Sequence, residues 1–201
     1  GGTLSVSAAA VFSGTLTGTL STAAQPNITS LGTLVTDSNV GIGTGSGTAK
    51  FVGVANVNTT AVGNVGVGED DLMTYSLPAN SLSANGKAIK VTMWGTTANN
   101  ANAKTLTIYF GTTALKAFTI AINTITDWIV DYMVIRSGVG TQRTGFKAFI
   151  SDQATQTAVV TSFESSSTNQ DEALALTIKA TAEATANNDL IKNGMAVEFL
   201  N

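Results

Sequence analysis

Residues 14–34 read GTLTGTLSTAAQPNITSLGTL, and this stretch repeats one small unit, Gly-Thr-Leu, at residues 14–16, 18–20 and 32–34. Each copy offers one glycine, one β-branched residue and one leucine, which a lone extended segment cannot bury. Repeats of this kind become stable only when copies stack, within one chain or between chains. The stretch carries no charge, which argues against a solvated disordered tether. We therefore interpret it as a β segment that requires a partner.

The same composition extends over residues 1–68, where only Asp37 and Lys50 are charged. Glycine recurs too often in this block for a helix interior, and its many threonines and valines favour extended structure. The block therefore predicts a shaft of short strands and turns. Because the chain begins with Gly1 rather than methionine, we expect more shaft upstream.

The composition changes at Glu69, where charged, aromatic and large aliphatic residues become more frequent. Residues 69–201 are long enough for a domain with a core of its own. Apolar residues alternate with polar ones along this block, which is the period of a half-buried strand. The alternating sets are Ile89, Val91, Met93; Leu106, Ile108, Phe110; Phe118, Ile120, Ile122; Trp128, Val130, Tyr132, Val134; Phe146, Ala148, Ile150; Val159, Thr161, Phe163; Leu174, Leu176, Ile178; and Val197, Phe199.

Turn and loop signals separate these segments. Turns are predicted at residues 85–86, 111–113, 137–140 and 193–194, and polar loops at 97–103 and 165–171. Residues 177–187 are rich in Ala, Lys and Glu and could form a helix, but their alanines alternate with polar residues, so we predict a strand. Eight to ten short strands at regular spacing favour an antiparallel sandwich, and we expect a jelly roll because Greek-key double sheets are common at this size.

The string TGTLSTAAQPNITSLGTL, within residues 14–34, resembles a repeat of viral fibre proteins, in phage tail fibres and in fibre-like proteins of large DNA viruses. The segment NVGIGT at residues 39–44 is similar to another common fibre segment, and the block from about Asp70 resembles the jelly-roll domains that end such fibres. The resemblance implies a slender β-shaft of three intertwined chains, a C-terminal head and a role in host attachment. The residues expected to pack around the trimer axis are Leu16, Leu20, Ile28, Leu31, Leu34, Val40 and Ile42.

Composition excludes several kinds of chemistry. The chain has no cysteine and no histidine, so disulfides, thiolate or imidazole metal sites and the usual catalytic triads are absent. Charged residues make up 11% and the formal net charge is −3, unlike the basic surface of a nucleic-acid binder. Because no run of 18 apolar residues occurs, we expect no membrane insertion.

Carboxylates are the remaining candidates for catalysis or metal binding. Asp127 and Asp131, or Glu69 and Asp71, could act as a pair in glycan hydrolysis, although structural carboxylates outnumber catalytic ones. The run Glu69-Asp70-Asp71 could also offer oxygens to Ca²⁺, with Glu69 and Asp71 as the candidate ligands. Since consecutive strand residues point to opposite faces, all three cannot bind one ion from one strand. We therefore predict a charged collar there and no bound metal or cofactor, although a trimer would repeat the collar three times around its axis.

Receptor contacts are expected from the polar loops of the head, whose amides and hydroxyls can bond to glycans, and from one tryptophan beside a loop. The receptor-binding candidates are Trp94, Asn99, Asn100, Asn102, Ser166, Thr168 and Asn169. Trp94 could stack on a sugar ring, but tryptophans are usually well buried. A contact between subunits, or between sheets, is therefore the expected role of its ring.

The leading hypothesis is a non-enzymatic virion-surface fibre protein, whose trimeric head binds a host receptor, expected to be a glycan, through multivalency. Its partners would be two further copies of itself, the receptor and upstream fibre or virion proteins. The alternative is a structural tip that caps and registers the trimer without binding the receptor. A glycan-degrading enzyme and a bacterial surface adhesin are further hypotheses.

Overall fold

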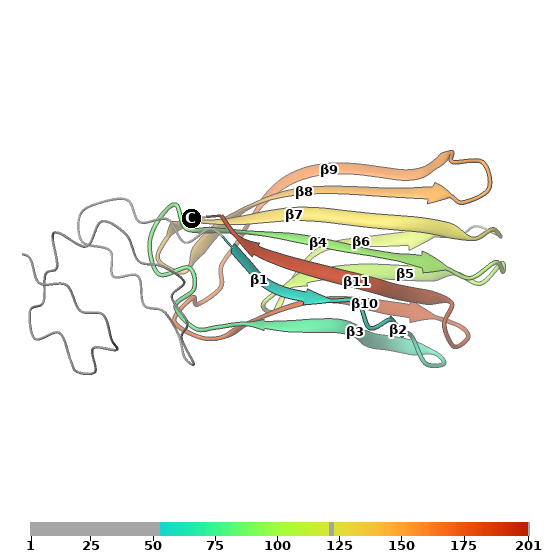
Figure 1. Ribbon diagram of the computed structural model, residues 1–201, viewed down its shortest axis with the longest axis horizontal. Coiled ribbons are helices and arrows are strands. Elements are labelled where there is room, and N and C mark those ends of the chain that lie inside the picture. Colours follow the sequence, from blue (N-terminus) through green and yellow to red (C-terminus); the bar gives the residue numbers. More distant parts are fainter. Residues whose placement is uncertain (1–52, 121–122, 201) are drawn as a thin grey trace, which may run out of the picture. The chain divides into compact units, whose positions relative to one another are not determined.

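The structure is a computed structural model that describes residues 53–120 and 123–200 (Figure 1). These residues form eleven β-strands and no helix, arranged as two antiparallel sheets. The residues predicted to pack around a trimer axis, from Leu16 to Ile42, lie outside the described part of the chain. The all-β, antiparallel class predicted from the alternation is confirmed.

The larger sheet has the order β1-β11-β4-β7-β8-β9, and the short β2 also pairs with β11. Its strands are β1 (Gly53–Asn58), β2 (Val62–Gly63), β4 (Ala88–Thr97), β7 (Thr126–Gly138), β8 (Thr141–Asp152), β9 (Ala158–Thr168) and β11 (Leu190–Phe199). The smaller sheet has the order β3-β10-β5-β6. Its strands are β3 (Gly68–Leu77), β5 (Lys104–Phe110), β6 (Thr113–Ile120) and β10 (Leu176–Ala184). The chain changes sheet at most connections, whereas β7, β8 and β9 follow one another as a meander.

The core lies between the two sheets and contains most of the alternating residues predicted from the sequence, together with others such as Leu72, Leu77 and Leu82. The predicted Ile122 lies outside the described residues. On β4 and β5, for example, Val91, Met93 and Ile108 have no exposed surface. Contacts join the layers directly, because the rings of Phe118 on β6 and Phe146 on β8 stack at a centroid distance of 5.8 Å. Within the segment 177–187, residues 177–184 form a strand and not a helix, as the sequence predicts, and the alanines of β10 are buried.

Strand β9 corrects the sequence analysis. Phe163 was placed on an apolar face together with Val159 and Thr161, but it is 79% exposed, and only Val160 of this strand packs partly against the core. The reason is position: β9 is the edge of the larger sheet, and Phe163 pairs with Lys147, whose side chain also points away from the core. Alternation defines two faces of a strand but not which of them meets the core.

Three smaller predictions are also corrected. The turn predicted at residues 193–194 is a β-bulge inside β11, between Lys192 and Gly194. The loop predicted at 165–171 begins only after Thr168, because residues 165–168 belong to β9. Leu174 precedes β10 and is exposed.

Residues 53–63 belong by composition to the repetitive block, yet they pair with β11 in the larger sheet. Strand β3 starts at Gly68, where the composition changes. The sandwich therefore includes strands on both sides of residue 69.

The antiparallel order gives the sandwich two different ends. Gly53 pairs with Phe199, so β1 begins and β11 ends at the same end, which we call the proximal end (Figure 1). Its connections are residues 78–87, 111–112, 139–140 and 169–175. The opposite, distal end carries residues 64–67, 98–103, 123–125, 153–157 and 185–189, which we call the distal loops.

Gly95 shows how tightly the sandwich is packed. A Cβ added to Gly95 would lie 1.9 Å from the backbone oxygen of Ile191 and 2.5 Å from the buried Trp128 ring, whereas one added to Gly145 would meet nothing within 4 Å. We expect Gly95→Ala to lower the free energy of unfolding by about 1–3 kcal/mol through overpacking, measured by urea denaturation. Gly145→Ala is the matched control and should leave stability within about 0.5 kcal/mol of the parent. Equal effects of both substitutions would contradict the described packing.

Lys192 is an unusual interior residue, with no exposed surface. Its Nζ donates to the backbone oxygen of Met73 at 2.9 Å and lies 3.4 Å from Met195 Sδ. Neither partner carries a charge, and burial lowers the pKa of Lys192 from 10.5 to about 7. The unfolded chain therefore holds a proton that the folded chain releases between these pH values, so this residue makes stability rise with pH across that window.

Replacing Lys192 by methionine tests this environment. At pH 6.5, we expect Lys192→Met to raise the free energy of unfolding by about 1–4 kcal/mol, because a buried charge is replaced by an apolar group of similar shape. At pH 10 the gain should shrink, which urea denaturation at both pH values would measure. Lys90→Met on the exposed face is the control. A gain that is the same at both pH values would show that Lys192 is not titrating in the folded chain.

Candidate functional site

The distal loops share one chemical character. They consist almost entirely of Asn, Gln, Thr, Ala and a few small apolar residues, and Asp189 is their only ionisable side chain. Asp189 is itself buried. The distal end therefore presents neutral hydrogen-bonding groups, which are both donors and acceptors, beside the exposed apolar side chains of Val65, Val67 and Ile125.

Asp189 fixes the loop between β4 and β5. Its carboxylate accepts hydrogen bonds from Asn100 Nδ2 at 2.5 Å, from Asn102 Nδ2 at 2.8 Å and from the Ala186 amide at 2.9 Å. Lys104 closes the same loop from beneath, because its Nζ donates to the backbone oxygens of Asn100 and Asn102, both at 3.0 Å. Two buried charged residues thus determine the shape of a loop that is neutral on its surface.

Burial alone would raise the pKa of Asp189, but the hydrogen bonds from Asn100, Asn102 and the Ala186 amide, together with the Lys104 charge, lower it below its ordinary value of 3.8. The carboxylate therefore stays ionised at neutral pH. An ionised Asp189 can accept all of these bonds at once.

Asn64 has a similar role on the other side of the distal end. This fully buried amide donates to the Ala186 oxygen at 2.8 Å and accepts from the Leu190 amide at 3.0 Å. Its backbone oxygen also accepts from the Asn188 amide at 2.9 Å. Residues 64–67 are thereby joined to the connection between β10 and β11.

A hollow of about 240 Å³ lies among three of these loops, and we call it the distal hollow. Its lining residues are Asn99, Thr124, Ile125, Gln153 and Ala154. The backbone N–H of Gln153 donates to the backbone oxygen of Ile125 at 2.9 Å, and this bond joins two of the loops that line the hollow. Asp152 Oδ1 accepts from the amides of Ala154 and Thr155, each at 2.8 Å. Backbone bonds therefore shape the hollow, and two of its side chains are also bonded: Thr124 Oγ1 donates to the Ile125 oxygen at 3.5 Å, and Gln153 Nε2 donates to Asp127 Oδ1 at 3.4 Å. The Asn99 side chain and Gln153 Oε1 are left to meet a ligand.

The structure separates the predicted receptor-binding residues. Asn99 lines the distal hollow, whereas the side chains of Asn100 and Asn102 are bonded to Asp189. Three further candidates lie toward the proximal end, at or just after the end of β9. These are Ser166, whose Oγ bonds to Thr144 at 2.6 Å, Thr168, which is buried and bonded to Gln142, and the exposed Asn169. One group of candidates therefore lies at the distal end, and the other lies at the opposite end.

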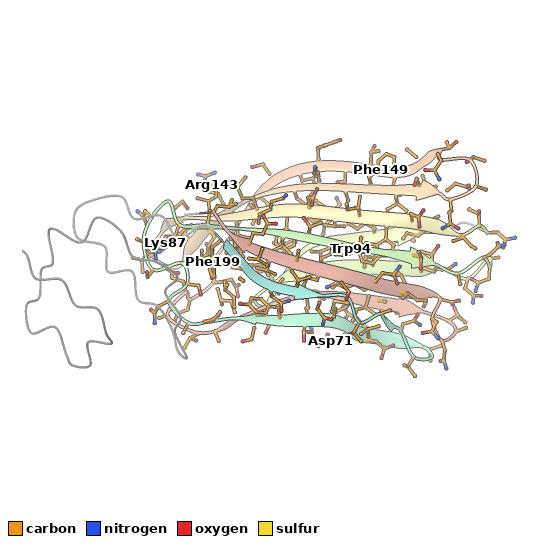
Figure 2. The ribbon with its side chains drawn as sticks, viewed as in Figure 1. Asp71, Lys87, Trp94, Arg143, Phe149 and Phe199 are labelled. Carbon is orange, nitrogen blue, oxygen red and sulfur yellow. The ribbon has the colours of Figure 1, made fainter. Side chains whose placement is uncertain are left out.

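Trp94 lies on the face of the larger sheet that points away from the core, which we call the outer face. Its half-buried ring covers Gly194, where an added Cβ would come within 2.1 Å of the ring. Figure 2 shows Trp94 on β4, with Phe149 on β8 in the same half of the sheet. A hollow of about 400 Å³ runs beside both rings, between Ile129 and Gln156.

The outer face also carries a charged pair. Asp131 is bonded to Lys147 Nζ at 2.9 Å and to Thr92 Oγ1 at 2.5 Å. Burial would raise the pKa of Asp131, but the bonds from Thr92 and Lys147 and the nearby charges lower it overall. Asp131 is therefore a paired carboxylate, and its lowered pKa is the opposite of what a general acid requires.

The carboxylate pairs have other partners. Asp127 and Asp131 are four residues apart on β7. Asp127 accepts a hydrogen bond from Gln153 Nε2 at 3.4 Å, and Asp131 is bonded to Lys147 and Thr92, as described above. Glu69 accepts from Tyr109 at 3.0 Å, and Asp71 pairs with Lys179 at 2.5 Å. Within residues 53–120 and 123–200, no group of three acidic, histidine or cysteine side chains could hold a metal ion.

Sequence reasoning missed most of the distal hollow. It also missed Asp189 and Lys104, the two buried charged residues that hold the loop that carries Asn99. Thr124, Gln153 and Ala154 lie in short connections far apart in the chain, and only the strand order brings them together. The run Asn187-Asn188-Asp189 between two alternating segments was the available signal for a structured connection.

No protein-family model matches the chain, and a search of the curated proteins found no match. Solved structures give distant likenesses. A protein of unknown function from Shewanella oneidensis MR-1 is 12% identical, with 74% of this chain and 75% of that chain covered and a TM-score of 0.36. The CBM2 module of the evolved Dit of Lactobacillus casei BL23 phage J-1 is 11% identical, with 75% and 80% covered and a TM-score of 0.34.

The VP2 subviral particle of infectious bursal disease virus is 10% identical, with a TM-score of 0.21, and the match covers 75% of this chain and 40% of that chain. At these TM-scores the likenesses carry no argument about function. In the described part of the chain, no helix has the length and apolar character needed to cross a membrane.

Asp189→Asn tests the support of the distal loops. The amide cannot accept every bond that the carboxylate accepts, so we expect a loss of about 1–3 kcal/mol in the free energy of unfolding at pH 7. Because the folded pKa is lowered, the parent should keep this stability above pH 3.8 and lose it as the pH falls through the folded pKa. Denaturation at pH 7 and pH 3 would measure both effects, with the exposed Asp171→Asn as control. A parent and variant that respond identically to acid would contradict the assignment.

Proposed function

We propose that this chain is the distal part of a trimeric virion fibre, whose jelly-roll head attaches to a glycan on the host-cell surface through the distal loops. The observation that carries the proposal is the distal hollow. It lies at the end opposite Gly53 and Phe199, and its polar lining is neutral amide and hydroxyl groups held by internal bonds. The repetitive block ahead of Gly53 would form the shaft, and Gly53 lies at the end of the sandwich opposite the distal loops.

A glycan fits this chemistry. Sugar hydroxyls both donate and accept hydrogen bonds, and Asn, Gln and Thr side chains do the same. Loops whose shape is already fixed by Asp189 and Asn64 lose little conformational entropy on binding. Basic residues, which a nucleic acid would require, do not occur in the distal loops.

Three heads on one fibre would turn weak single contacts into firm attachment, because linked sites bind with a high effective concentration. The partners are two further copies of the chain, the receptor glycan and the upstream part of the fibre or virion. The role is binding without catalysis, and it needs no cofactor or metal.

A second candidate function is a structural tip that caps and registers the trimer while another protein recognises the host. The apolar residues exposed on the outer face favour it, because Ile129, Met133 and Phe149 would gain stability by contact with another protein. The two functions differ in whether the isolated trimer binds any glycan.

The test is a glycan array with the intact chain, after light scattering has established a trimer of three 20.5 kDa chains. For a glycan that binds, we expect Asn99→Ala and Gln153→Ala each to weaken binding about tenfold, the effect of one lost hydrogen bond. Asn169→Ala, an exposed amide at the proximal end, is the matched control and should bind like the parent.

Two results would count against attachment by the distal loops. A trimer that binds no glycan from any plausible host would favour the structural tip. Loss of binding in Asn169→Ala, with Asn99→Ala unaffected, would move the receptor site to the proximal end.

A further inference from the structure

Large apolar side chains are exposed at both edges of the outer face. At the β1 edge Val54 is 62% and Val57 is 59% exposed, and at the β9 edge Phe163 is 79% exposed. Ile129, Met133 and Phe149 lie on the strands between these edges and are also exposed. Apolar groups spread over a whole sheet face in this way are typical of a protein–protein contact.

The pairing register places Val57 and Phe163 in one row. Phe163 pairs with Lys147, Lys147 with Asp131, and Asp131 with Thr92. Thr92 pairs in turn with Ala196, and Ala196 with Val57. Partners in an antiparallel ladder lie at the same level along the strands and share a face. Val57 and Phe163 are therefore the two ends of a row across six strands, about 24 Å long at the usual strand spacing.

The middle of the outer face is hollowed and mostly apolar. Besides the hollow beside Trp94, one of about 170 Å³ lies between Phe149 and Phe163, and one of about 270 Å³ lies over Gly145. The charged pair in the row, Asp131 and Lys147, is neutralised by its own contact. Lys90 and Arg143 also lie exposed on this face, so a surface that covers its apolar middle must leave these two charged ends in water.

We propose that a second copy of this chain covers the outer face, with Phe163 at the β9 edge of one copy packed against Val57 at the β1 edge of the next. This contact joins two different edges, so it is head-to-tail, and repetition of it closes into a ring when the rotation fits. Rotation about an axis parallel to the strands leaves every residue at its own level. Residues that meet across such a ring must therefore share a level, as Val57 and Phe163 do.

That the covering protein is a second copy of this chain is inferred from the segment that precedes β1. The 52 residues that precede Gly53 contain the Gly-Thr-Leu repeats, which need other copies to bury their leucines. They join the sandwich at β1, which is the strand that bears Val57 and forms one edge of the outer face. Repeats that associate between chains would therefore bring further copies to this edge. The inference rests on the trimer of the proposed function and adds which surfaces meet in it.

Cysteine cross-linking tests the contact, because the chain has no cysteine of its own. The variant Val57→Cys/Phe163→Cys would be oxidised as the intact chain and separated on a denaturing gel. A disulfide needs Cβ atoms about 4 Å apart, so two sites at opposite ends of the row cannot bridge within one copy. We expect covalent trimers from the double variant and no cross-link from either single variant. The control pair Val57→Cys/Val139→Cys uses another highly exposed valine, 88% exposed at the proximal hairpin, and should stay uncross-linked.

Light scattering of the same samples separates the possible failures. A trimer in which the double variant does not cross-link would overturn this contact and leave the proposed fibre intact. If glycan binding were then lost in Phe149→Ala, the face would be assigned to the glycan. Covalent dimers from a single variant would show a symmetrical pairing of like edges, which also overturns the head-to-tail contact. A monomer would overturn both proposals.

Discussion

The burial of one face of β7 is the constraint on which the rest of the structure depends. Trp128, Val130, Tyr132 and Val134 alternate along this strand of thirteen residues and are covered by the smaller sheet. A slip of one residue would turn all four outward and bring Asp127, Asp131 and Met133 into the core. The register of β7 with β4 and β8 is therefore strongly specified, and every residue of the outer face takes its position from it.

At the two ends of the sandwich, buried polar side chains, and not apolar ones, hold the chain in place. Connections between strands expose backbone groups that no ladder satisfies, and both ends use buried polar side chains to bind them. At the proximal end the buried Glu172 pairs with Arg136 and accepts from the Gly140 amide at 2.9 Å. At the distal end Asp189 bonds mainly to neutral amides. The charge is thus held beneath the distal surface, which leaves that surface suited to an uncharged ligand.

The sequence predicts those parts of the structure that depend on local pattern. Alternation locates most buried strand positions, and glycines at 86, 111 and 140 lie in turns with positive φ, as the turn signals predict. It fails for Phe163, because an edge strand has the same alternation as a central one and only the strand order shows which face is left uncovered. The turn signal fails at Asn193-Gly194, because the same dipeptide can form a turn or, as here, a β-bulge beneath a tryptophan ring.

The candidate site was less predictable than the fold for the same reason. Asn99, Asn100 and Asn102 look alike in the sequence, and only the position of Asp189 decides which of them bond inward. Whether a loop lies at the distal end depends on the number of strands between Gly53 and that loop, because each strand reverses the direction of the chain. The composition of the loop does not give this number.

The two proposed surfaces are compatible because they use different directions of one sandwich. The distal hollow opens at the end of the strands, whereas the Val57–Phe163 contact acts across them, so copies related by rotation about the strand direction would keep their distal loops on one side. The outer face would then contribute stability while the distal loops remain available to a receptor. This arrangement also gives a physical reason for the chemical contrast between them. A surface buried between copies gains from apolar side chains, whereas an end surface that stays in water until it meets a receptor is better made mainly of neutral polar groups that remain hydrated.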